Sequence, residues 1–88
     1  MNIMKIPKVI RQFLPVKVKV AAGPYIYKTY ALRKSTVRSV LKRCGEDANN
    51  YDVFAIDGGF SSADTPLDGM IGNWSRCWVY ANNKAYNM

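Results

Sequence analysis

The sequence predicts a single α+β domain in which one helix crosses one face of a mixed sheet. Residues 16–20 and 25–32 are rich in β-branched and aromatic side chains and are separated by turn residues, which is typical of a β-hairpin. A capped amphipathic helix is expected over residues 35–44, and further strands are expected at 52–56 and 75–81. A helix that leads from a hairpin to a third strand must cross one face of the sheet. We therefore expect an α+β roll with a mixed sheet of four or five strands packed on one helix.

The N-terminal residues 1–15 predict a basic amphipathic arm or short helix. Within this segment the apolar side chains recur at helical spacing, as Ile6, Val9, Ile10, Phe13 and Leu14. Pro7 fits only the first helical turn, and Pro15 ends the segment. Because two turns are marginal in isolation, we expect the arm to dock on its own domain, on a partner or on an anionic membrane surface.

The foldable domain is expected to span residues 16–81. Val16 to Val20 alternate valine with lysine, which predicts a half-buried strand, and residues 21–24 supply a turn to the second strand. Ser35 or Thr36 is expected to cap the helix. The apolar stripe of this helix is Val37, Val40, Leu41 and Cys44, and Gly45 is expected to close it in the left-handed conformation.

The second half of the chain predicts the remaining strands. A buried strand at 52–56 ends in the tight-turn sequence Asp57-Gly58-Gly59, after which Phe60 begins a short return segment. Residues 64–69 predict a capped single helical turn, because Pro66 lies just inside its start. The last strand is expected over 75–81, followed by a flexible tail over residues 82–88.

In element order and patterning, residues 16–81 resemble the ubiquitin-like β-grasp superfamily. The segments that carry the resemblance are VKVKV and YIYKTYAL as the opening hairpin, STVRSVLKRCG as the helix, DVFAIDGG as the third strand, and DTPLDGM and RCWVYA at the end. The resemblance implies that the first and last strands are adjacent and parallel. Modifiers of this family end in Gly-Gly, whereas this sequence ends in Lys84-Ala85-Tyr86-Asn87-Met88. Among the family's uses, the resemblance therefore favours a compact adaptor whose sheet face binds another macromolecule.

Composition argues against catalysis. The 88 residues include no histidine, the usual general base near neutral pH and the commonest zinc ligand. The cysteines, Cys44 and Cys77, lack the spacing of an iron–sulphur ligand set and are expected to be small buried hydrophobes. The carboxylates Asp57, Asp64 and Asp68 are expected to end turns and cap the short helix, and the alternative is that they bind a divalent cation. We expect no enzyme activity, no catalytic residues, no metal and no cofactor.

The charge distribution predicts a binding protein. The first 45 residues hold eleven of the thirteen lysines and arginines and no acid, whereas the rest hold all six acids, for a net charge of +7. Such a field steers the protein toward acidic partners. No apolar run approaches the length of a membrane span, a membrane partner is disfavoured, and the cytoplasm is the expected compartment.

The candidate partner-binding site is an aromatic and basic face of the sheet. If the valines of residues 16–20 face the helix, the resemblance places five side chains together on the opposite face: Lys17, Lys19, Arg76, Trp78 and Tyr80. The alternative is that Trp78 and Tyr80 pack under the N-terminal arm. A secondary basic surface is expected on the arm and the helix, formed by Lys5, Lys8, Arg11, Arg38, Lys42 and Arg43.

Two kinds of partner fit this face. A protein is favoured, with the aromatic side chains as anchors and the cations as a steering rim. Single-stranded nucleic acid is the alternative, with bases stacked on Trp78 and Tyr80 and lysines along the phosphates. Small size and basic charge also suit a phage or mobile-element factor that acts on host machinery.

Overall fold

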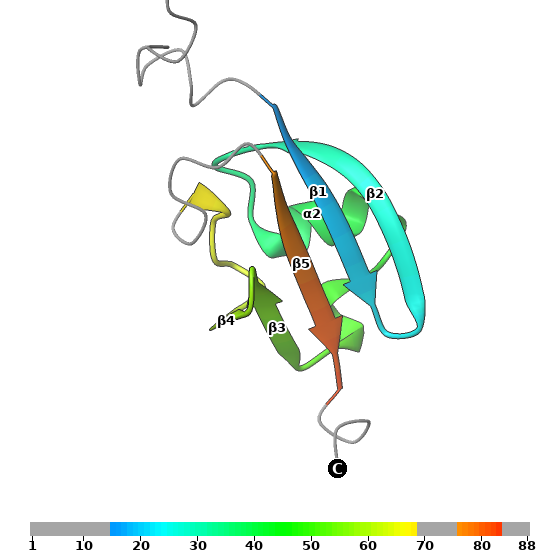
Figure 1. Cartoon of the computed structure of the whole chain (residues 1–88). Helices are drawn as coiled ribbons and strands as arrows, with labels where there is room; N and C mark the ends of the chain where they lie inside the picture. The colour runs from blue at the N-terminus through cyan, green and yellow to red at the C-terminus, as the bar shows by residue number, and fades with distance from the viewer. Residues whose placement is uncertain (1–14, 69–75, 84–88) are drawn as a thin grey trace, which may run out of the picture.

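The structure, a computed structural model, describes residues 15–68 and 76–83. These residues form one mixed five-stranded sheet with the α-helix α2 (Val37–Arg43) on one face, as Figure 1 shows. The strands are β1 (Pro15–Ala22), β2 (Tyr25–Leu32), β3 (Val53–Ile56), β4 (Gly59–Ser61) and β5 (Arg76–Asn82), and a short 3-10 helix, η2 (Ala48–Asn50), follows α2. The strand order is β2-β1-β5-β3-β4. The predicted α+β class, with one helix against a mixed sheet, is confirmed.

The first two strands form the predicted hairpin, and both run for eight residues. They are antiparallel and in register from Pro15 opposite Leu32 to Ala22 opposite Tyr25. The two-residue turn between them begins with Gly23, whose φ of 58° is accessible to glycine at little cost. Its backbone N–H donates to the carbonyl of Ala81 over 2.9 Å, which joins the turn to β5.

The helix α2 begins and ends as its sequence predicts. The Thr36 hydroxyl accepts from the backbone N–H of Ser39 over 3.2 Å, so Thr36 rather than Ser35 is the N-cap. At the other end Gly45 has φ 81°, and the N–H groups of Gly45 and Glu46 donate to the carbonyls of Lys42 and Leu41. These bonds satisfy carbonyls that the last helical turn leaves open.

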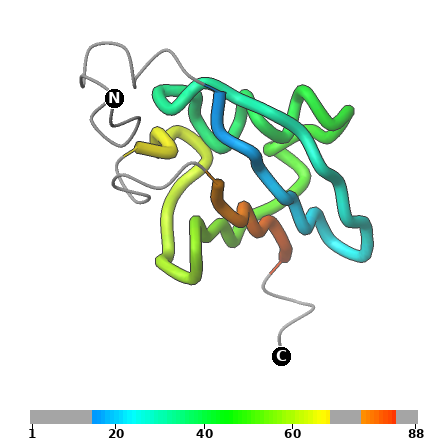
Figure 2. The backbone as a smooth tube through the Cα atoms, turned by 45° about the horizontal axis from the view of Figure 1, so that its top comes forward, coloured from blue at the N-terminus to red at the C-terminus, as the bar shows by residue number. Residues whose placement is uncertain are grey.

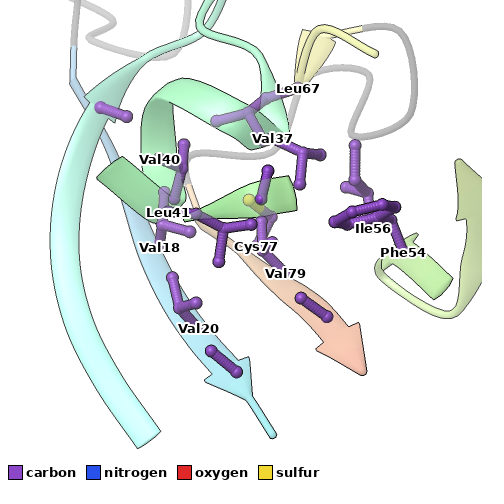
Figure 3. Close-up of a cluster of buried hydrophobic side chains, with 14 of the residues drawn as sticks. Val18, Val20, Val37, Val40, Leu41, Phe54, Ile56, Leu67, Cys77 and Val79 are labelled. Atoms are coloured by element: carbon purple, nitrogen blue, oxygen red, sulfur yellow. The ribbon is translucent and has the colours of Figure 1, made fainter. Parts of the chain in front are cut away.

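The core lies between α2 and one face of the sheet. Val16, Val18 and Val20 of β1 are almost completely buried, as are Val37, Val40 and Leu41 of α2. Figure 3 shows side chains from β1, β5 and the helix gathered between the two layers, with Ile56 and Phe54 of β3 at one side. Cys77 and Val79 fill the same layer from β5, so the alternation predicted for the last strand is correct.

The second half of the sheet is organised around β5. This strand is parallel to β1 and antiparallel to β3, and both tube and ribbon views show β1 and β5 side by side (Figure 2). The hairpin β3–β4 turns through Asp57 and Gly58, both with positive φ, 50° and 86°. This is the tight turn that the Asp-Gly-Gly sequence predicts.

Some predicted boundaries were wrong or fall elsewhere. β5 includes Asn82, the first residue of the predicted tail. The helical turn predicted over residues 64–69 does not begin at residue 64. Residues 64–67 are not helical, and Pro66 forms an isolated β-bridge with Thr36. Among residues 64–68, helical conformation is found at residue 68. The bridge adds a backbone pairing there that local sequence does not encode. β1 is longer than predicted, because it begins at Pro15, assigned to the arm, and includes Ala21 and Ala22, assigned to the turn. The other predicted arm residues, 1–14, and residues 84–88 lie outside the described residues.

Candidate interaction face

Strand register gathers the predicted site residues on the sheet face that lies away from α2. In β1 the valines point toward the helix, so Lys17 and Lys19 point to the other side. The parallel pairing with β5 places Lys17 beside Arg76 and Lys19 beside Trp78. Tyr80 follows on the same face, next to Ala21. We call this surface the open face: its cations are Lys17, Lys19, Lys28 and Arg76, and its large apolar and aromatic side chains are Ile26, Tyr30, Leu32, Phe60, Trp78 and Tyr80.

A cation–π contact lies at the centre of the open face. The ammonium group of Lys19 lies 4.5 Å from the centroid of the Trp78 ring system. The indole nevertheless remains 47% exposed, although it belongs to a central strand. A contact of this kind contributes about 0.5–1 kcal/mol at an exposed site. It holds both side chains in one orientation before any partner arrives.

The backbone of Trp78 is fixed by Asp57. One carboxylate oxygen of Asp57 accepts from the Trp78 N–H over 2.8 Å, and the Asp57 N–H donates to the Trp78 carbonyl over 2.9 Å. The sequence predicts Asp57 in the tight turn, or alternatively as a ligand of a divalent cation, and indicates no contact with Trp78. The turn conformation, with its left-handed φ, is what aims the carboxylate at β5. Asp57 is therefore a positioning residue for the indole.

Two surface pockets flank Lys19 on the open face. The larger, of about 560 Å³, is lined by Lys19, Asp57, Arg76, Cys77 and Trp78. The smaller, of about 240 Å³, is lined by Lys17, Val18, Lys19, Lys28, Thr29 and Tyr30. Each pocket combines at least two cations with one aromatic ring. This composition suits acidic side chains that carry some apolar surface.

The open face is larger than the sequence prediction. Register places Lys28 of β2 opposite Lys19 and Tyr30 opposite Lys17. On the far side, Phe60 of β4 is 85% exposed and lies opposite Ala55, which in turn faces Tyr80. The alternation within residues 25–32 contained the signal for Lys28 and Tyr30. It identifies residues that share a face, but assigning that face needs the register with β1.

The side chains of the open face form bands across the strands. One band is apolar and runs through five neighbouring strands as Ile26, Ala21, Tyr80, Ala55 and Phe60. Beside it lie Lys28, Lys19 and Trp78, followed by Tyr30, Lys17 and Arg76. An apolar band therefore lies beside two bands that each combine cations with one aromatic ring. Such a surface fits a partner with an apolar strip bordered by acidic groups.

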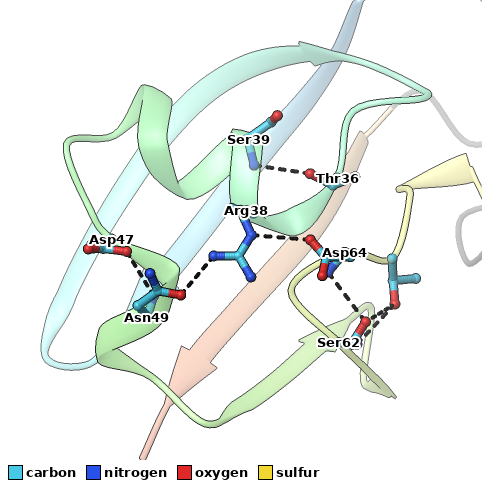
Figure 4. Close-up of polar contacts among 8 residues, drawn as sticks. Thr36, Arg38, Ser39, Asp47, Asn49, Ser62 and Asp64 are labelled. Carbon is cyan, nitrogen blue, oxygen red and sulfur yellow. Dashed lines mark hydrogen bonds and ion pairs between the residues drawn. The ribbon is translucent and has the colours of Figure 1, made fainter.

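The helix cations form a different surface. Lys42 and Arg43 are exposed on α2, which covers the opposite face of the sheet. Arg38 is engaged, since its guanidinium pairs with Asp64 at 3.1 Å and donates to Asn49 over 2.9 Å (Figure 4). It joins α2 to η2 and to the segment that follows β4. The predicted arm cations Lys5, Lys8 and Arg11 lie outside the described residues.

Two tyrosines converge on one carboxylate away from the open face. The hydroxyls of Tyr27 and Tyr51 donate to the two carboxylate oxygens of Glu46, the latter over 2.7 Å. The hydrogen bond with Glu46 raises the pKa of each tyrosine to about 12. The same bonds lower the pKa of Glu46, that from Tyr27 most. This cluster ties the end of α2 to β2 and to the segment before β3.

Burial and hydrogen bonds account for both cysteines and for two of the three aspartates that the sequence offered as cation ligands. Burial raises the pKa of Cys77 to about 11 and also raises that of Cys44, so both thiols are protonated near neutral pH. Asp57 bonds to β5 and Asp64 to Arg38. Within residues 15–68 and 76–83, no three histidine, cysteine, aspartate or glutamate side chains form a group that could hold a metal ion.

No family profile matches the sequence, and a comparison with curated proteins found no match. In the part of the chain that the structure describes, helices fall short of the length and apolarity needed to cross a membrane.

Proposed function

We propose that the chain is a non-catalytic binding protein of the β-grasp class that engages an acidic protein surface through its open face. The Lys19–Trp78 contact supports this proposal most directly, because it presents a half-exposed indole within a group of cations on a rigid sheet. Tryptophan and arginine are the side chains most enriched at binding hot spots. A preformed arrangement reduces the entropy lost on binding.

Strand order supports the β-grasp part of the proposal. An opening hairpin, a crossing helix and a final strand inserted between β1 and β3 follow the element order that the sequence resemblance implies. In particular, β1 and β5 are adjacent and parallel. Residues that are distant in the sequence, such as Lys19 and Trp78, meet only through this pairing.

Two features favour a protein over single-stranded nucleic acid. Lys19 lies over the Trp78 ring system at 4.5 Å, where it competes with a base for that side of the indole. Ile26, an aliphatic side chain at one end of the apolar band, is 58% exposed. An aliphatic side chain gives a base no stacking platform but contributes normally to a protein interface.

The test is a capture experiment with two charge-matched variants. Tagged full-length protein is incubated with native lysate, with and without nuclease. One variant carries Lys19→Glu and Arg76→Glu on the open face, and its control carries Lys42→Glu and Arg43→Glu on α2. We expect an acidic protein that is retained by wild type and control, resists nuclease and is lost with the open-face variant.

Other outcomes would contradict the proposal. Loss of the captured protein only with the α2 variant would move the interface to the helix. Nuclease-sensitive capture, together with oligonucleotide binding whose log K falls steeply with log salt, would favour the nucleic-acid alternative. Circular dichroism of each variant checks that the charge reversals leave the fold intact.

A further inference from the structure

The outer strand β2 has an edge with no strand beside it among the described residues. It begins the order β2-β1-β5-β3-β4 and runs for eight residues at the border of the sheet in Figure 1. An edge strand presents backbone N–H and C=O groups ready for pairing, and proteins usually protect such edges with proline, several charges or a bulge. Between Tyr25 and Leu32 there is no proline, and the only charged residue is Lys28. Register with β1 is uninterrupted over all eight residues.

The side chains of β2 alternate strictly between the two faces of the sheet. Those at even positions lie on the open face, opposite Pro15, Lys17, Lys19 and Ala21 of β1. Three of them are large, apolar or aromatic, and half exposed or more: Ile26 at 58%, Tyr30 at 53% and Leu32 at 50%. These side chains leave much of their surface in contact with water at the very edge where another strand would pair.

The sequence of β2 complements itself in the antiparallel register centred on Thr29. When two copies pair about a twofold axis, residues directly opposite share a face, so even positions must pair with even positions. A register centred on Lys28 sets two ammonium groups against each other. A register centred on Thr29 instead sets Ile26 against Leu32 of the second copy and Lys28 against Tyr30 of the second copy. Both pairs then occur twice.

We propose that the protein self-associates through β2, with Thr29 facing Thr29 of a second copy. The two sheets become continuous, and the open faces of the two copies lie side by side. This inference needs the backbone edge of β2 rather than the partner-binding centre around Trp78, although Ile26, Lys28 and Tyr30 also belong to the open face.

Charge gives the dimer a salt dependence of known sign. Each copy carries a net charge of +7, so two copies repel each other, and added salt screens that repulsion. The dimer is therefore expected to tighten as salt rises. Binding of an acidic partner to the open face weakens under the same change. The two proposals are consequently distinguished by one titration.

Sedimentation equilibrium of the full-length protein tests the contact. Tyr30→Glu places a carboxylate opposite Lys28 of the second copy and should tighten the dimer, whereas Tyr30→Lys and Ile26→Lys should weaken it. Because each cross-strand pair occurs twice, we expect the dimer Kd to change by roughly 2- to 30-fold. Phe60→Lys on β4 is the matched control, being a more exposed apolar position at the opposite edge, and should leave the Kd unchanged.

Cysteine cross-linking tests the register. Thr29→Cys puts two thiols opposite each other at a spacing of about 4.5–5.5 Å between Cα atoms, which a disulfide accepts. Oxidised glutathione should oxidise the two thiols introduced at position 29 to an intermolecular disulfide and is itself reduced to two molecules of glutathione. Lys28→Cys is the control and should form the disulfide much more slowly, because in this register residue 28 faces residue 30 of the second copy. The wild type shows how much cross-linking comes from Cys44 and Cys77.

The proposal is overturned if the wild type remains monomeric up to about 1 mM at high salt, a concentration at which even weak association is visible. It is also overturned if Tyr30→Glu weakens the dimer, or if Lys28→Cys links faster than Thr29→Cys. If the wild type forms the dimer but captures no acidic protein from lysate, the proposed function alone is contradicted.

Discussion

Lys19 and Trp78 are 59 positions apart in the sequence and adjacent in the sheet, with the ammonium group 4.5 Å from the centroid of the indole. Their contact exists because β5 inserts beside β1 in parallel orientation. The same pairing sets Arg76 next to Lys17. A change in the relative register of these two strands by one residue would turn the indole into the core, so the open face depends directly on the sheet.

Replacing Trp78 should weaken partner binding strongly and leave the domain folded. Trp78→Ala removes a half-exposed ring, and the folded domain loses the cation–π contact, about 0.5–1 kcal/mol, together with the packing of the buried half of the ring. A central aromatic anchor is worth at least about 2 kcal/mol in binding, or roughly 30-fold in Kd. Calorimetric titration with the captured partner, together with a melting curve, measures both quantities. A large drop in Tm with unchanged affinity would place the role of Trp78 in stability instead.

Removing the Asp57 carboxylate should destabilise the β3–β4 turn and loosen Trp78. Asp57→Ala loses the acceptor for the Trp78 N–H, which costs about 1 kcal/mol, and adds about 1 kcal/mol of strain at a φ of 50°. We expect Tm to fall by roughly 10 °C in a domain of this size. Asp57→Asn is the control, because asparagine keeps an acceptor and tolerates the left-handed conformation, and its Tm should fall much less. Equal losses in both variants would show that charge, rather than turn geometry, is responsible.

The limits of sequence reasoning follow from the range of each signal. Period-two alternation gave the two faces of β1 and β5 correctly, and capping residues placed α2 to within a residue. Alternation cannot assign a face to β2 without its register, and therefore Lys28 and Tyr30 were missed. The adjacency of β1 and β5 came from the family resemblance rather than from the pattern itself.

Long-range polar contacts were also beyond the sequence. Arg38 was expected to point to solvent as part of a basic surface, but it pairs with Asp64, 26 positions away. The contact between Tyr27 and Glu46 spans 19 positions. Both separations are far longer than the about two to four residues that bring side chains together within one strand or helix. Only the folded arrangement of the elements therefore reveals these pairs. Asp57 was correctly assigned to a turn, but its hydrogen bond to Trp78 needed the position of β5.

Core truncation in α2 should be much more costly than a change at the adjacent exposed position. Leu41 has no exposed surface and packs between the helix and the sheet. Leu41→Ala should lower the free energy of unfolding by about 2–5 kcal/mol, through lost burial and the cavity left behind. Lys42→Ala is the matched control on the same helical turn and should change it by less than about 0.5 kcal/mol. Urea unfolding measures both, and similar values for the two variants would contradict the packing described for α2.

The Tyr27–Glu46–Tyr51 cluster should give stability a dependence on pH at both ends of the scale. Hydrogen bonds from the tyrosines lower the pKa of Glu46 from its ordinary value of 4.5, so the folded state favours the carboxylate. That contribution is complete above pH 4.5 and is lost as the pH falls through the lowered pKa. The pKa values of Tyr27 and Tyr51 are raised from 10.0 to about 12, so the contribution of their protonated forms is complete below pH 10 and is lost as the pH rises toward 12.

We expect Glu46→Gln to lower Tm at neutral pH and the difference from wild type to shrink at both extremes. Tyr51→Phe should reproduce the alkaline part in weaker form, because Tyr27 still donates to Glu46. A Tm difference that stays constant from acid to alkaline pH would show that the cluster stabilises the fold by packing alone.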